Sequence, residues 1–161
     1  MMRVRVMVPI LLSVGGLYLH GETVRNGNEV ALAYTRADAE GRRALKTQFE
    51  GKLLTFRFLR VVRIVPPSFD APRGALPILE TVEPSSELTV WVHPQGAISR
   101  DVIASLTTNE AVAVSGRLET LDPPEQPLSL RVKPAVVRHK DRPAPKGEKE
   151  LLSEIDPRAV R

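Results

Sequence analysis

The sequence predicts an all-β fold with a small helical content, namely a barrel of five strands within residues 51–138. Three observations predict it. First, five apolar stretches alternate inward and outward side chains with the two-residue period of a strand. Second, prolines end these stretches, as at Pro66-Pro67 and in the three-proline segment 122–127. Third, one segment between the strands, residues 100–106, is predicted to be helical, with Ser99 as its N-cap.

The predicted strands cover residues 52–65, 76–82, 87–93, 111–121 and 128–137. Alternation in the first and longest strand divides its side chains between two faces. The expected inner face carries Leu54, Phe56, Phe58, Val62 and Ile64, and the expected outer face carries Thr55, Arg57, Val61 and Arg63. Gly116 interrupts the fourth strand, where a glycine indicates a bulge or a tight bend of a barrel.

A helix is predicted ahead of the barrel, over residues 29–48, because apolar side chains recur there every three or four positions. Asn28 is its expected N-cap and Gly51 closes it. Gly41 weakens its middle, where the helix could break into two pieces. The element order is therefore one helix followed by β–β–β–α–β–β. A five-stranded Greek-key barrel with a helix between strands three and four is the OB-fold, so residues 22–138 are predicted to form one OB-fold domain.

The first 21 residues allow two interpretations. A basic start, Met1-Met2-Arg3-Val4-Arg5, precedes an apolar run that ends at Leu19, which is the pattern of a secretory signal peptide. This pattern predicts an exported, extracytoplasmic protein. Because no A-x-A cleavage site is present, the alternative is a β-hairpin that turns at Gly15-Gly16, in a chain that stays in the cytoplasm. The run is shorter than the ~20 residues of a transmembrane helix, so no integral membrane span is expected.

The composition argues against several kinds of chemistry. The chain of 161 residues has no cysteine, which excludes disulfides, zinc–cysteine sites, iron–sulfur clusters and thiol nucleophiles. Its histidines, His20, His93 and His139, are far apart in sequence. No serine lies in a G-x-S-x-G motif, and no G-x-x-x-x-G-K phosphate loop occurs. We therefore expect a non-enzymatic binding module with no catalytic residues, metal site or cofactor.

The candidate site is a basic outer face of the predicted barrel. OB-folds bind single strands through basic side chains and aromatic stacking, and the net charge of +4 permits such a polyanionic partner without requiring one. The predicted nucleic-acid-binding residues are Arg57, Arg63, Trp91, His93, Arg117, Arg131 and Lys133. Glu87 and Glu119 are the acidic residues expected to oppose them. The alternative is that Trp91 packs under the helix at 29–48 and that the basic side chains are ordinary solvated strand positions.

A protein partner is the other candidate for the same barrel. It would use the proline-rich loops at 66–77 and 122–127, the exposed strand edge of a partly open barrel, or the tail. The tail, residues 139–161, is charged and contains prolines, with a short helix predicted at 148–155. The sequence leaves the oligomeric state open.

Several segments also resemble a known family. The helix segment Glu29-Val30-Ala31-Leu32-Ala33-Tyr34 leads to Phe49-Glu50-Gly51-Lys52-Leu53-Leu54-Thr55-Phe56, and Leu88-Thr89-Val90-Trp91-Val92 follows further on. Asn109 to Leu118 then carries a V-x-V-x-G entry into the fourth strand. Together they resemble the bacterial tRNA-anticodon-like OB-fold proteins over residues 29–138. The resemblance implies an OB-fold and, by descent, nucleic-acid binding. Because many members lie outside the cytoplasm, it equally allows an exported domain that binds a protein or a small ligand.

Overall fold

A computed structural model describes residues 24–121, 129–141 and 146–155. The signal peptide or hairpin predicted at 1–21 and the proline-rich loop at 122–127 lie outside these residues. The elements, in chain order, are β1 (Arg25–Asn26), α1 (Gly27–Arg36), α2 (Ala39–Phe49), β2 (Leu53–Val65), β3 (Ile78–Glu83), β4 (Leu88–Pro94), α3 (Gly96–Ala104), β5 (Ala111–Leu121), β6 (Ser129–His139) and α4 (Glu148–Ile155).

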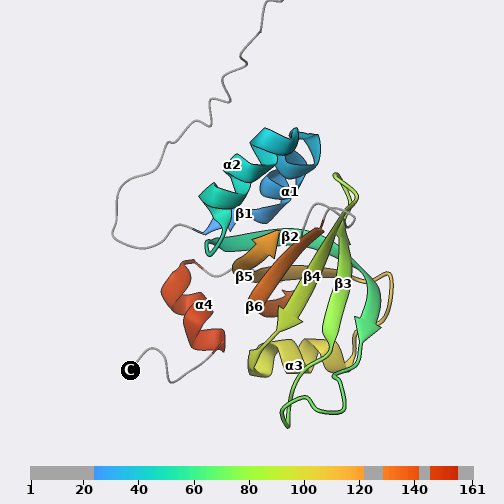
Figure 1. Ribbon diagram of the computed structural model, residues 1–161. Coiled ribbons are helices and arrows are strands. Elements are labelled where there is room, and N and C mark those ends of the chain that lie inside the picture. Colours follow the sequence, from blue (N-terminus) through green and yellow to red (C-terminus); the bar gives the residue numbers. More distant parts are fainter. Residues whose placement is uncertain (1–23, 122–128, 142–145, 156–161) are drawn as a thin grey trace, which may run out of the picture.

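Five of the described strands close into a barrel, which confirms the predicted barrel (Figure 1). Their order is β2–β3–β4–β6–β5, and β5 pairs with β2 again to complete the ring. The barrel is mixed, because β4 and β6 run parallel while the other four pairs are antiparallel. The two-residue β1 lies outside the ring and pairs in parallel with β2.

The predicted faces of β2 are wrong in its middle part, whereas Arg63 is exposed and Ile64 packs against the core as predicted. Phe58 and Val62 were expected inside but are 41% and 43% exposed, whereas Val61 was expected outside and is fully buried. The pairing of β2 with β5 shifts register between Phe56 and Leu59. An extra residue in a strand reverses the alternation beyond it. The inward positions therefore change from even numbers, as in Phe56, to odd numbers, as in Leu59.

Gly116 is a point of close approach between two neighbouring strands, β5 and β6. A Cβ atom at this position would lie 2.4 Å from the carbonyl oxygen of Pro134 and 2.6 Å from Cγ1 of Val132. The β5–β6 register shifts directly after this glycine. The bend expected from a glycine within the strand is thus present, and it lets β5 turn against β6 as the barrel closes.

The predicted helix over 29–48 is two helices, α1 and α2, and they cover one end of the barrel (Figure 1). The chain breaks at Ala37–Asp38 rather than at Gly41, because the Asp38 side chain accepts a hydrogen bond from Gly41 N (2.8 Å) and caps α2. α1 is capped by Asn26, not by Asn28. Its apolar side chains enter the main core, and these are Val30, Ala31 and Tyr34.

Asn28 instead ties α1 to the barrel. Its Nδ2 donates to the carbonyl of Phe58 (3.2 Å) and to Oε1 of Glu83 (3.0 Å). Glu83 is 2% exposed and also accepts from the backbone N (2.7 Å) and the hydroxyl (2.6 Å) of Ser86. Burial raises the pKa of Glu83, but the hydrogen bonds from Ser86 and Asn28 outweigh it and leave that pKa below its ordinary value. This carboxylate therefore joins α1, β3 and the β3–β4 turn.

The other two helices pack elsewhere on the barrel. α3 starts at Gly96, earlier than predicted, and Ser99 is not its cap. The Ser99 hydroxyl donates to the carbonyl of Gln95 (2.7 Å) and accepts from Val137 N (3.0 Å), which fixes α3 against β6. α4 buries Leu151 against the barrel, and Glu154 pairs with the buried Arg138. Among the described residues no helix has the length and apolar character needed to cross a membrane.

Candidate functional site

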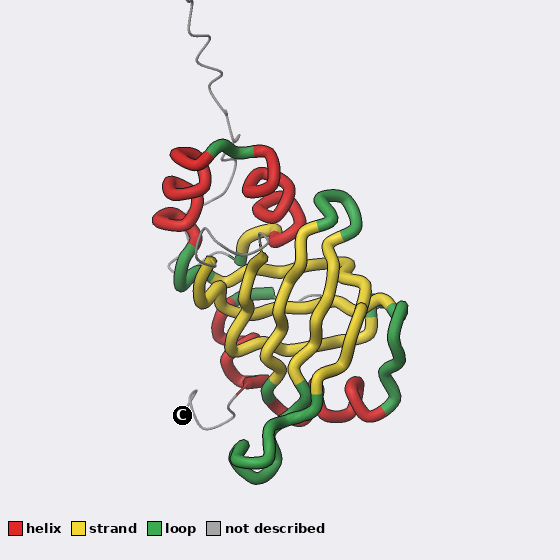
Figure 2. The backbone as a smooth tube through the Cα atoms, turned by 45° about the vertical axis from the view of Figure 1, so that its right-hand side comes forward, coloured by secondary structure: helices red, strands yellow, loops and turns green. Residues whose placement is uncertain are grey.

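The candidate site lies on the outer face of β3, β4 and β6. Cross-strand pairing sets four outward residues in one row, because Arg63 is opposite Glu80, Glu80 is opposite Trp91, and Trp91 is opposite Arg131. We call this row, together with His93, Lys133 and Glu119, the Trp91 face. No helix crosses the front of these strands (Figure 2). α1 and α2 lie at one end of the barrel, and the Trp91 side chain is half-buried.

Carboxylates on the face are paired with its basic groups. Arg63 Nη2 is 2.7 Å from Glu80 Oε2, and its Nε donates to the same oxygen (2.8 Å). Glu119 lies between two cations, with its carboxylate oxygens 3.9 Å from Arg131 Nη1 and 3.7 Å from Lys133 Nζ. These side chains are between 23% and 63% exposed. Pairs this exposed are worth about 0–1 kcal/mol each, so an incoming anion can replace the carboxylates at little cost.

His93 is the titratable group at the edge of the face. Burial lowers the pKa of His93, Lys133 and Arg131 lower it further by repulsion, and Glu119 partly opposes them. The lowered pKa favours the neutral form of the imidazole. Two neighbouring cations also make this histidine a poor ligand for a metal ion.

Two of the seven predicted residues lie away from the face. Arg57 lies at the β2 irregularity beside α1, where its backbone N donates to Asn28 Oδ1 (3.0 Å). Arg117 is opposite Leu53 of β2, and its Nη1 donates to the carbonyl of Gly51. The structure thus brings together Arg63, Trp91, His93, Arg131 and Lys133. Glu87, expected to oppose the basic residues, lies in the β3–β4 turn with φ 56°.

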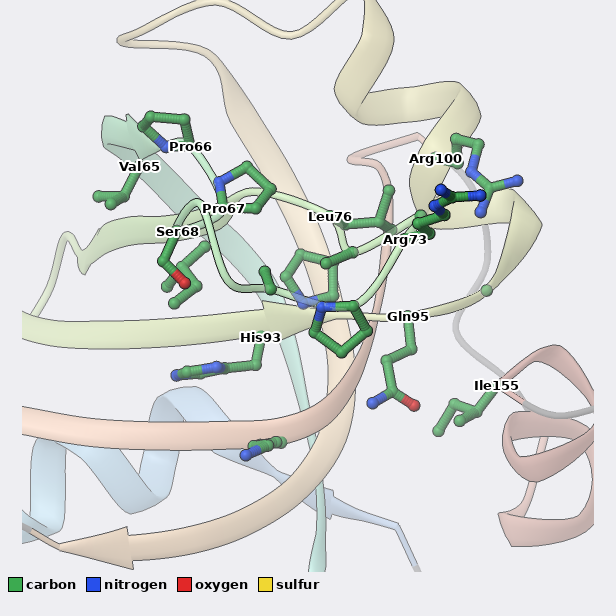
Figure 3. Close-up of a pocket in the computed structure, with 18 residues that line it drawn as sticks. Val65, Pro66, Pro67, Ser68, Arg73, Leu76, His93, Gln95, Arg100 and Ile155 are labelled. Carbon is green, nitrogen blue, oxygen red and sulfur yellow. The ribbon is translucent and has the colours of Figure 1, made fainter.

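A cleft of about 740 Å³ continues the Trp91 face (Figure 3). Its walls are the loop at 66–77, the junction of β4 with α3, and Ile155 of α4. His93 and Lys133 line the cleft as well as the face. Arg73 and Arg100 also line it, and no carboxylate side chain does so among the described residues. The cleft is therefore a second, more strongly cationic part of the same surface.

The sequence predicts the 66–77 loop as a candidate surface for a protein partner, but none of its residues is among the predicted residues of the site. Phe69 is fully exposed on this loop, and Arg73 follows it. The loop is held in shape by its prolines and by two turns, with backbone bonds from Ala71 N to Ser68 O (3.0 Å) and from Ala75 N to Pro72 O (3.0 Å). Loop residues carry no periodic signal, so only their types, an aromatic and an arginine between prolines, pointed to a site.

No known protein family matches this chain, and no curated protein matches it either. Within the part of the chain that the structure describes, no group of three or more His, Cys, Asp or Glu side chains could hold a metal ion. The arrangement presents one aromatic ring for stacking, exchangeable ion pairs around that ring, and a cationic cleft at its end.

Proposed function

We propose that this chain is an OB-fold binding module that holds single-stranded nucleic acid across the Trp91 face. The observation that carries the proposal is the row in which Trp91, half-buried, stands on an outer strand face between Glu80 and Arg131. An indole with one accessible surface and cations beside it is the combination that non-sequence-specific single-strand binders use.

The barrel topology supports the OB-fold assignment. The ring order β2–β3–β4–β6–β5 has α3 between its third and fourth strands along the chain, as the OB-fold does. OB-folds bind oligonucleotides across their second and third strands and the loop between the first and second. Here those elements are β3, β4 and the loop at 66–77, which are the elements that carry the Trp91 face and the cleft. The resemblance to tRNA-anticodon-like proteins points in the same direction.

Binding is then an exchange of partners. A base stacks on the accessible part of Trp91, which contributes about 1–3 kcal/mol. Phosphates displace Glu80 from Arg63 and Glu119 from Arg131 and Lys133, and release counterions as they bind. Since neither contact reads a base edge, we expect little sequence preference and strong dependence on salt.

Fluorescence of Trp91, the only tryptophan in the chain, provides the test. Titration at low salt with a thymidine oligonucleotide of about 12 nucleotides, within the range that one OB-fold covers, is expected to quench it. The variant Arg63→Gln should bind more weakly, while Arg43→Gln, which removes the same charge from an exposed site on α2, should bind like the wild type. The proposal would be refuted if the oligonucleotide did not quench Trp91 at low salt, or if both variants lost the same amount of binding affinity.

A protein or small ligand bound by an exported domain is the second candidate. It is favoured by the apolar side chains that the β2 irregularity turns outward, Phe58 and Val62. This candidate predicts that single strands leave Trp91 fluorescence unchanged. It further predicts that an apolar fluorescent dye binds the wild type more strongly than it binds Phe58→Ser, since that variant loses exposed apolar surface.

A further inference from the structure

The cleft contains two arginines, Arg73 and Arg100, that have no carboxylate partner in the described part of the chain. Asp70 and Asp101 are close in sequence, but neither lines the cleft. The cations of the Trp91 face, in contrast, have Glu80 and Glu119 as partners.

The two arginines belong to segments that meet at one wall of the cleft. Arg100 projects from α3, and its Nη2 lies 3.7 Å from the position that a Cβ atom would take at Gly74. Gly74 has φ +82°, a left-handed conformation that turns the chain directly after Arg73. Figure 3 shows the Arg73 and Arg100 side chains at the same end of the cleft, with His93 toward the other end.

We propose that this cleft binds the terminal phosphate of the single strand that lies on the Trp91 face, an inference that rests on the proposed function. A terminal phosphomonoester carries a charge of about −1.5 to −2 at pH 7, whereas each phosphodiester carries only one negative charge. Arg73, Arg100 and Lys133 supply three cations to the cleft. Guanidinium groups bind phosphate oxygens in a bidentate manner, so two of them match a group with three terminal oxygens.

The location of the cleft explains how a strand on the Trp91 face reaches it. Lys133 and His93 belong to both surfaces, so a strand on the face reaches the cleft without a gap. Beyond them the lining continues to Arg73, to Arg100 of α3 and to Ile155 of α4. The end of the strand is placed there because a terminal phosphate carries more negative charge than an internal one.

Three thymidine oligonucleotides of equal length test the inference: one with a 5′-phosphate, one with a 3′-phosphate and one with hydroxyls at both ends. One phosphorylated form is expected to bind the wild-type protein about tenfold more tightly than the hydroxyl form, as two charge-assisted contacts would give. The form that gains affinity identifies which end occupies the cleft. Arg73→Gln and Arg100→Gln are expected to abolish this preference, and Arg43→Gln is expected to keep it. All three positions are exposed, so the variants should unfold at the same temperature as the wild type.

The failures are distinguishable. If all three oligonucleotides bind the wild type equally, the terminal-phosphate site is refuted while single-strand binding stands. If Arg73→Gln weakens the binding of all three oligonucleotides equally, the terminal-phosphate site is also refuted. That arginine would then contact a part of the strand that all three share. If none of the three binds, the proposed function itself fails and the inference fails with it.

Discussion

Glu119 offers a test in which removal of a negative charge is expected to improve binding. Its carboxylate lies 3.9 Å from Arg131 and 3.7 Å from Lys133, so it competes with a phosphate of the ligand for these two cations. Glu119→Gln keeps the size of the side chain and removes its negative charge. Both cations then become available to the ligand without displacement of a competitor.

The magnitude follows from the geometry. A phosphate bound to these cations would lie roughly 6 Å from the Glu119 carboxylate, and at an effective dielectric constant of about 40–80 the repulsion is about 0.7–1.4 kcal/mol. Its removal corresponds to a gain in affinity of about three- to tenfold. Folding should change little, because the three side chains are 39–48% exposed and such pairs contribute at most about 1 kcal/mol.

The assay is the dissociation constant for the thymidine oligonucleotide, measured at several salt concentrations. Glu119→Gln should bind more tightly at low salt, and its advantage should shrink as salt screens the charge. Glu40→Gln is the matched control, because it removes the same charge from an exposed position in the first turn of α2. If both variants gain the same affinity for the oligonucleotide, the change in net charge alone explains the gain. If Glu119→Gln gains nothing, the Trp91 face is not where the phosphates bind.

Three further predictions concern stability and pH. Glu154→Gln should lower the free energy of unfolding in urea by about 3–5 kcal/mol, because it leaves the charge of the buried Arg138 without its carboxylate; a loss below about 1 kcal/mol would contradict this. The pKa of Glu83 is lowered, so its contribution to stability is present above its ordinary pKa of about 4.3 and is lost as the pH falls through the lowered value. Urea titrations from neutral to acidic pH should therefore show less acid destabilisation in Glu83→Gln than in the wild type. The pKa of His93 is also lowered, and a bound polyanion would favour its protonated form, so oligonucleotide affinity should rise as the pH falls below about 6.5. His93→Asn should remove that rise, and an equal rise in the variant would exclude His93 as its source.

The sequence by itself predicted the barrel and the outward positions of several candidate residues. Alternating side chains fixed where the strands are, because a strand without a bulge exposes every second residue regardless of its partners. The same rule put Trp91, His93, Arg131 and Lys133 outward, and the structure has them on one surface. Prolines marked the strand ends for an equally local reason, since they cannot donate to the ladder.

The tertiary structure alone decided what depends on pairing between distant segments. The irregularity in β2 is a property of its register with β5, so the sequence of β2 could not reveal that Phe58 faces solvent and Val61 faces the core. Pairing likewise set Glu80 beside Arg63 and Arg117 opposite Leu53 of β2. The cleft combines a loop, a strand end and two helices that are far apart in sequence. A local pattern predicts which way a side chain points. Which other side chains lie beside it in a closed barrel depends on how the strands pair.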